Sequence, residues 1–158
     1  MIDHTRSNMN AYNPNPYGAN NQTINQVPSG KPTILVADDS PIIGAVFKKA
    51  LEDNEKYEVT VATDGTKAIE IIQSKGINDI PLLFLDLNMP KTNGFDVLEF
   101  LRVNNLFYNI NVNIVSGNLA SEEITRACAY PVKNVYDKST LSIGKIQEIV
   151  ASYDSVRR

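Results

Sequence analysis

Five short strand-like runs alternate with stretches of helical periodicity from Lys31 onwards, and this alternation limits the possible folds more than any other feature. The runs lie at Thr33–Ala37, Tyr57–Ala62, Leu82–Leu85, Asn111–Ser116 and Asn134–Tyr136. The first is apolar throughout, which is typical of a strand that is covered on both faces. Strands joined by right-handed helical crossovers pair in parallel and place helices on both faces. The sequence therefore predicts an α/β fold, a doubly wound five-stranded parallel sheet of order 2-1-3-4-5 with five helices.

The segments between these runs carry apolar residues on one helical stripe each. In the first of them, Ser40 stands at the expected N-cap and Pro41 at the first helical position. Its predicted inward stripe consists of Ile42, Ile43, Val46, Phe47, Ala50 and Leu51. The other helices are predicted over 65–75, 95–103 and 121–127, and around Ile146, Ile149, Val150 and Tyr153.

Residues 1–30 differ from the rest of the chain. They are rich in asparagine and proline, and their charged side chains are Asp3 and Arg6 alone. A segment with so little apolar surface cannot offset the entropy lost on ordering. We therefore expect a flexible Asn/Pro-rich arm over 1–30 and one folded domain over 31–158. Tyr12 and Tyr17 could dock on a partner, but a solvated tail is the simpler interpretation.

Charge and cysteine content exclude some classes of function. A net charge of −3 leaves no excess of lysine and arginine to neutralise phosphates, which argues against a nucleic-acid partner. No window has the length of a membrane span, and the N-terminus lacks the apolar stretch of a secretory signal, so we expect a cytoplasmic protein without a membrane partner. Cys128, the single cysteine, cannot form an internal disulfide, and we expect it to be a small buried apolar residue.

Polar residues stand where the predicted strands end. Asp38 and Asp39 follow the first strand and Asp86 the third, Ser116 ends the fourth, and Lys138 follows the fifth. In doubly wound sheets, ligands bind outside the carboxyl ends of the strands. We therefore expect three acids, a hydroxyl and a lysine to converge at one edge of the sheet.

This combination predicts a cation site. Three carboxylates repel one another, and hard oxygen ligands suit Mg²⁺; the chain has no Cys/His cluster for zinc. Asp86 could form an aspartyl phosphate, with Lys138 and the metal offsetting the developing charge. Taken singly, each residue has a plainer explanation as a helix cap, a turn residue, a strand-end hydroxyl or a surface lysine. Their conjunction at neighbouring strand ends favours the site.

Four motifs at these strand ends also carry a resemblance. They are "LVADDS" at 35–40, "LDLNMPKTNG" at 85–94, "IVSG" at 114–117 and "YDKS" at 136–139. Through these motifs the chain resembles the receiver domains of bacterial two-component response regulators. The resemblance extends from about Lys31 to Ser155. The order of acid pair, acid, hydroxyl and lysine is of the family type, as are the gaps of 30 residues from Asp86 to Ser116 and 22 from Ser116 to Lys138.

The resemblance implies a role for each matching position. Asp86 would accept phosphate from a sensor histidine kinase or a phosphotransfer protein. Asp39 would bind Mg²⁺ directly and Asp38 through metal-bound water, with the backbone carbonyl of Asn88 as a further ligand. Ser116 would be the switch hydroxyl, and Lys138 would form an ion pair with the phosphoryl group. Gly117 would offer a backbone N–H. A downstream effector protein would read a change in the face formed by the fourth helix, fifth strand and fifth helix.

Some positions depart from the family pattern. Ser139 stands where a proline in a cis peptide usually follows the lysine, and non-proline cis bonds are costly, so we expect a different path for this loop. Val135 stands where the family usually has an aromatic switch residue, and an aromatic residue, Tyr136, follows one position later. Because strand side chains alternate between faces, Tyr136 should point to the other side.

Three functions remain open on the sequence. The first is a stand-alone receiver, a signalling phosphoacceptor and not an enzyme, which acts through protein contacts or a phosphorelay, with a homodimer possible. For this function we also expect that no output domain follows the fifth helix. The second is a pseudo-receiver, an interaction module that works without phosphorylation. The third is a Mg²⁺-dependent phosphatase, which is disfavoured because Asn88 stands where such enzymes need a further acid.

Overall fold

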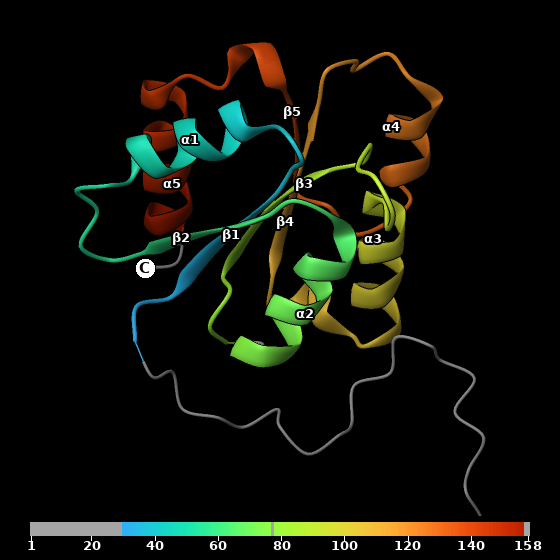
Figure 1. Cartoon of the computed structure of the whole chain (residues 1–158), viewed down its shortest axis with the longest axis horizontal. Coiled ribbons are helices and arrows are strands. Elements are labelled where there is room, and N and C mark those ends of the chain that lie inside the picture. The colour runs from blue at the N-terminus through green and yellow to red at the C-terminus, as the bar shows by residue number, and fades with distance from the viewer. Residues whose placement is uncertain (1–29, 77, 157–158) are drawn as a thin grey trace, which may run out of the picture.

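The computed structural model describes residues 30–76 and 78–156, which form one twisted parallel sheet with helices on both faces (Figure 1). The strands occur in the order β2-β1-β3-β4-β5, and every neighbouring pair is parallel. The predicted fold class and strand order are therefore confirmed. Residues 1–29 of the predicted arm lie outside the described residues.

The elements follow the predicted ranges closely. The strands are β1 Thr33–Ala37, β2 Glu58–Ala62, β3 Leu82–Asp86, β4 Asn111–Ser116 and β5 Asn134–Asp137. The α-helices are α1 Pro41–Ala50, α2 Gly65–Lys75, α3 Gly94–Val103, α4 Glu122–Ala127 and α5 Ile143–Val156, and two short 3₁₀ turns are η1 Leu106–Tyr108 and η2 Lys138–Thr140. β3 and β5 are each one residue longer at their carboxyl ends than predicted, so Asp86 belongs to a strand and Lys138 directly follows one.

The alternation of side chains along each strand divides the core into two layers. In β1, Leu35 and Ala37 face one layer, whereas Ile34 and Val36 face the other. The first layer packs under α2 and α3 and the second under α1 and α5, on opposite sides of the sheet in Figure 1. Burial on both faces explains why β1 and β3 are apolar at consecutive positions.

The same alternation separates Val135 from Tyr136. Val135 packs against the layer under α2 and α3, and Tyr136 packs against the layer under α1 and α5. The ring of Tyr136 lies 6.4 Å from that of Phe84, whose ring centroid is in turn 4.7 Å from that of Phe47. The prediction that Tyr136 points away from the side of Val135 is therefore confirmed.

Two burial predictions are wrong. Ile42 is 73% exposed, because the buried positions of α1 are Ile43, Gly44, Phe47 and Ala50, and Ile42 lies beyond Ile43 on the side away from Gly44, outside this stripe. Cys128 is exposed, not buried. It caps the C-terminal end of α4, where the inward position is taken by its neighbour Ala127.

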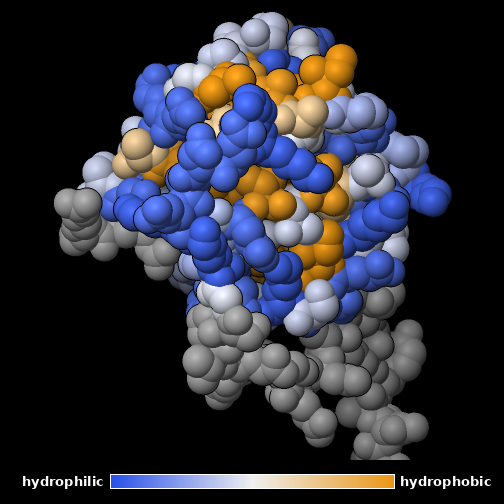
Figure 2. All heavy atoms as spheres, turned by 60° about the vertical axis from the view of Figure 1, so that its left-hand side comes forward, coloured by the Kyte–Doolittle hydropathy of each residue, from blue (hydrophilic) through white to orange (hydrophobic). Residues whose placement is uncertain are grey.

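The surface on the α1 and α5 side is mixed. Figure 2, which turns the left-hand side of Figure 1 forward, shows polar and charged side chains over most of this face, with apolar patches between them. The longest helix in the described ranges, α5, has 14 residues, and no helix there combines the length and the apolar character that a bilayer crossing requires.

The register of the sheet brings the strand ends together. Ala37 of β1 pairs with Leu85 of β3, so the next residues, Asp38 and Asp86, are neighbours at the same edge. On the other side of β3, Asp86 pairs with Val115, next to Ser116. Parallel pairing thus places Asp38, Asp86 and Ser116 at the carboxyl edge of the sheet.

Candidate functional site

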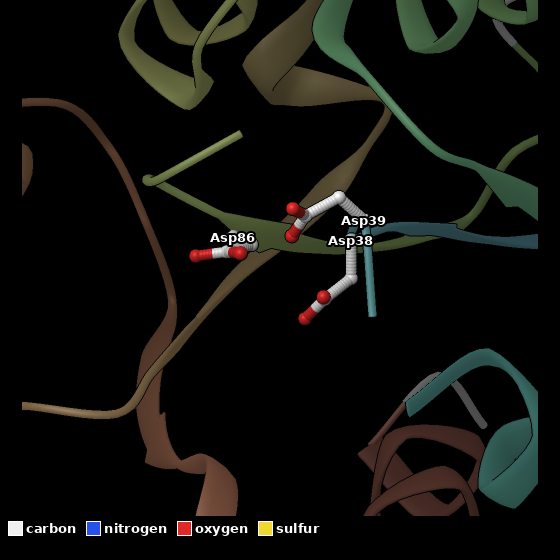
Figure 3. A group of neighbouring side chains, drawn as sticks. All are labelled: Asp38, Asp39 and Asp86. Carbon is white, nitrogen blue, oxygen red and sulfur yellow. The ribbon is translucent and has the colours of Figure 1, made fainter. Parts of the chain in front are cut away.

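Three carboxylates meet at the carboxyl edge of the sheet. Asp38 and Asp39 come from the end of β1, and Asp86 is the last residue of β3. Figure 3 shows the three side chains around one common space, and each offers one oxygen within 4.8 Å of the oxygens of the other two. Asp38 is 2% exposed and Asp86 3%, whereas Asp39 is open to solvent.

The environment of Asp86 opposes its ionisation. Burial raises the pKa of this carboxyl above its ordinary value, and the nearby charge of Asp38 raises it further. Hydrogen bonds from the Asn88 N–H and from Lys138 offset only part of this rise in pKa. Independently of this shift, the cluster sets three carboxylates against the single ammonium of Lys138, so a bound cation would offset negative charge there.

Lys138 bridges the two buried acids. Its Nζ lies 2.9 Å from Oδ2 of Asp38 and 2.9 Å from Oδ2 of Asp86. Burial lowers the pKa of this ammonium, but the two carboxylates raise it more, so the net shift is upward. Lys138 is therefore held in its charged form between Asp38 and Asp86.

Backbone amides fix the second oxygen of each buried acid. The N–H of Ser40 donates to Oδ1 of Asp38 at 2.8 Å, and the N–H of Asn88 donates to Oδ1 of Asp86 at 3.0 Å. Each donor lies two residues after its acceptor, which is the pattern of an Asx-turn. Both carboxylates are thus oriented by the turns that leave their strands.

Ser116 lies at the same edge, but its hydroxyl is turned into its own loop. It donates to the carbonyl oxygen of Asn118 at 3.2 Å and accepts from the Asn118 N–H at 3.1 Å. Gly117 follows at the start of this loop, and a Cβ built on it meets no atom within 4 Å. The structure therefore brings Asp38, Asp39, Asp86 and Lys138 close together. Ser116 lies beside them, but its hydroxyl is hydrogen-bonded to the backbone of Asn118.

Two residues around the site were not predicted from the sequence. Glu123 of α4 accepts a hydrogen bond at 3.0 Å from the side-chain amide of Asn88, which links α4 to the loop after Asp86. Nothing in the local sequence indicates this contact, because 35 residues separate the partners. The second residue is Asp137, whose side chain caps η2, and here the sequence holds a signal, since an aspartate at a strand end commonly accepts from the backbone N–H two residues on.

The acid cluster fits a hard divalent cation. It offers carboxylate oxygens alone, without sulfur or imidazole ligands, and two of its members are buried and held by backbone hydrogen bonds. Oxygen ligands and remaining access to water through exposed Asp39 suit Mg²⁺, which keeps several water ligands. The chemistry of the donor set therefore matches the predicted metal.

The turn after Asp86 requires glycine at position 94. The Gly94 N–H donates to the carbonyl of Leu87 at 3.1 Å. A Cβ on Gly94 would lie 2.4 Å from the carbonyl oxygen of Asp86 and 2.7 Å from Cα of Leu87. Both are backbone atoms that cannot rotate away, so a side chain here would displace the turn that carries the acid.

We expect Gly94→Ala to destabilise the fold by about 1–3 kcal/mol, because the added methyl group forces a backbone shift beside Asp86. Urea denaturation followed by circular dichroism measures this loss. Gly144→Ala is the matched control: a Cβ at Gly144 in α5 meets nothing within 4 Å, and alanine favours a helix over glycine by up to about 1 kcal/mol. Equal denaturation midpoints for Gly94→Ala and the unmodified chain would contradict the prediction.

The molecule is a doubly wound parallel α/β protein with an acidic cluster, bridged by a lysine, at the carboxyl ends of its strands. The family model of the response regulator receiver domain matches residues 34–151. The chain belongs to this family, and it is a receiver domain of two-component signalling.

Curated relatives agree with this assignment. The transcriptional regulatory protein CpxR of Escherichia coli strain K12 is 41% identical over 69 residues, which cover 44% of this chain and 28% of CpxR. The chemotaxis protein CheY1 of Helicobacter pylori strain J99 is 29% identical over 101 residues, which cover 64% of this chain and 80% of CheY1. The matched part therefore spans little more than a quarter of CpxR but most of CheY1.

Solved structures confirm the fold. The receiver domain of the Francisella response regulator 1452 superposes with a TM-score of 0.65 at 29% identity, covering 81% of this chain and all of that one. The chemotaxis protein CheY4 of Vibrio cholerae superposes with a TM-score of 0.64 at 21% identity, covering 78% of this chain and 98% of that one. At that lower identity the likeness to CheY4 concerns the fold alone.

Proposed function

We propose that this receiver domain accepts a phosphoryl group on Asp86, with Mg²⁺ bound at the acid cluster, and signals through protein contacts. The observation that carries the proposal is the environment of Asp86. Its carboxylate is buried at the edge of the sheet, beside two further carboxylates and the ammonium of Lys138. A structural aspartate in a turn needs none of these neighbours.

The proposed reaction is a phosphoryl transfer between side chains. An oxygen of Asp86 forms a bond to phosphorus while the bond from phosphorus to the donor nitrogen of a phosphohistidine breaks, and the released imidazole takes up a proton. The donor would be a sensor histidine kinase or a phosphotransfer protein. Lys138, already 2.9 Å from Asp86, offsets the negative charge on the transferred group.

Mg²⁺ would be held by Asp38, Asp39, Asp86 and the backbone carbonyl of Asn88, and it supplies positive charge beside the transferring oxygens. Ser116 would act as the switch hydroxyl. Its hydroxyl would exchange its present bonds to Asn118 for the phosphoryl group. A downstream effector protein would recognise the resulting surface, so the domain acts as a phosphoacceptor and not as an enzyme with its own substrate.

Incubation with Mg²⁺ and a small phosphodonor such as acetyl phosphate tests this proposal. Intact-mass measurement should show one added phosphoryl group per chain. The added mass should disappear when Mg²⁺ is removed with a chelator. A chain that gains no mass under these conditions would count decisively against the proposal.

We expect Mg²⁺ to stabilise the folded chain, because it relieves repulsion among carboxylates that converge only on folding. At a concentration one hundred times Kd, the gain is about 2.7 kcal/mol by mass action. Thermal unfolding in increasing Mg²⁺ measures it as a rise in Tm. Asp39→Asn should reduce this rise, whereas Asp53→Asn, on the exposed loop after α1, should leave it intact. A Tm independent of Mg²⁺ would rule out binding at the acid cluster.

A pseudo-receiver is the alternative that specific observations favour. Val135 stands at the usual aromatic switch position, and Tyr136 packs against Phe84 on the opposite side of the sheet. If the readout does not depend on phosphate, partner binding stays the same in Asp86→Ala and in the presence of beryllofluoride. Binding measurements with a captured partner separate the two proposals.

A further inference from the structure

The loop that carries Lys138 depends on its neighbour Asp137. The last register pair of the sheet on this side is Ser116 with Asp137, so Lys138 lies one residue beyond the paired part of β5. Its side chain nevertheless places Nζ 2.9 Å from Oδ2 of both Asp38 and Asp86. Holding a long, flexible side chain beside two carboxylates costs conformational entropy, and a fixed backbone lowers that cost.

Asp137 supplies this restraint through hydrogen bonds. Its Oδ1 accepts from the backbone N–H of Ser139 at 2.9 Å and from the Ser139 hydroxyl at 2.7 Å. Its carbonyl oxygen accepts from the hydroxyl of Thr140 at 2.8 Å. These hydrogen bonds join the residue before Lys138 to the two residues after it. They close the 3₁₀ turn η2, which begins at Lys138. They also lower the pKa of Asp137, which keeps its carboxylate charged as an acceptor.

Ser139 is what makes this arrangement possible. A proline at this position would fix its own φ near −65° but would have no N–H to donate. Serine leaves φ free and brings two donors, and both are used by Asp137. The aspartate before the lysine and the serine after it therefore act as a pair.

We propose that Asp137 is the positioning residue of Lys138: by binding both donors of Ser139 it holds the turn that carries the ammonium to Asp38 and Asp86. This inference deepens the proposed phosphoryl transfer and rests on it for its consequence on rate. Displacement of a group beside the reaction by about 1 Å can cost on the order of 100-fold in rate. Because Asp137 itself touches neither acid in the described structure, the effect is indirect.

Three variants separate positioning from charge. Asp137→Ala removes the acceptor, Asp137→Asn keeps an oxygen acceptor without the charge, and Ser139→Ala removes one of the two donors. With Mg²⁺ and acetyl phosphate, we expect Asp137→Ala to lower the initial rate of labelling about tenfold, while Asp137→Asn stays within about threefold of the unmodified chain and Ser139→Ala lies between.

A second measurement does not require phosphorylation. An ammonium held between two carboxylates is shielded from amine-acylating reagents, so Lys138 should react more slowly than Lys145, whose partner Glu148 lies on the exposed face of α5. Peptide mass spectrometry reads each lysine separately. We expect acylation of Lys138 to rise severalfold in Asp137→Ala, with Lys145 unchanged as the internal control for folding.

The outcomes distinguish this inference from the proposed function. If the unmodified chain gains no phosphate but Lys138 becomes reactive in Asp137→Ala, positioning holds and the phosphoacceptor role fails. If the chain is labelled, and Asp137→Ala changes neither the labelling rate nor the reactivity of Lys138, positioning is refuted alone. Equal defects in Asp137→Ala and Asp137→Asn would assign the effect to charge and would also refute it.

Discussion

Asp86→Asn is expected to abolish the uptake of phosphate from a small phosphodonor. The amide has nearly the shape of the carboxylate, and its oxygen can still accept the 3.0 Å hydrogen bond from the Asn88 N–H. It has no anionic oxygen to attack phosphorus, so the loss concerns chemistry and not folding. Intact-mass measurement of both proteins after the same incubation with Mg²⁺ gives the result directly.

The control for this prediction is a second aspartate-to-asparagine change. Asp53→Asn alters an exposed acid on the loop after α1 and should leave labelling unchanged. Fragment masses from the labelled protein should place the phosphoryl group on the peptide that contains Asp86. Equal labelling of Asp86→Asn and the unmodified chain would transfer the role to another residue and overturn the proposed site.

Phe84→Ala is expected to destabilise the fold by about 3–5 kcal/mol, a large part of the 5–15 kcal/mol that typically stabilises a domain. Phe84 is 1% exposed in the middle of β3, and its ring contacts those of Phe47 and Tyr136. Truncation loses the transfer free energy of the ring and leaves a cavity between the sheet and α1. Urea denaturation at equilibrium gives the free energy of unfolding for both proteins.

An exposed aromatic residue provides the matched control. Tyr108 of η1 is 93% exposed, and Tyr108→Ala should change the free energy of unfolding by no more than about 0.5 kcal/mol. A loss of similar size in both variants would mean that the effect comes from aromatic content and not from burial. In that case, the assignment of Phe84 to the core would be wrong.

The strands and helices of this fold were predictable because their signals are local. A strand buried on both faces must be apolar at consecutive positions, and α1 requires an apolar residue at every third or fourth position. The start of α1 was equally local: Ser40 is the N-cap and Pro41 the first helical residue, as predicted, although the Ser40 side chain makes no capping hydrogen bond. Asp64 and Asn93, which were not predicted as caps, accept hydrogen bonds from backbone N–H groups three residues on at the starts of α2 and α3.

Burial of single residues was less predictable. Ile42 is apolar and adjacent to the buried stripe of α1, yet it is exposed, because composition does not fix the rotation of a helix to within one residue. Cys128 is exposed for the same reason at the end of α4. The state of the Ser116 hydroxyl was also beyond prediction, since it depends on the path of the loop to Asn118.

The order of strands and helices, and the acids, hydroxyl and lysine at the strand ends, follow from hydrophobic period and chain order, which are properties of the chain alone. Which of their atoms meet depends on how the elements pack together. Lys138 bridges Asp38 and Asp86, and Glu123 binds the side chain of Asn88, through contacts between separate elements. Such contacts depend on the register of the sheet and the angle of each helix to within an ångström or so, and no local pattern of residues encodes that.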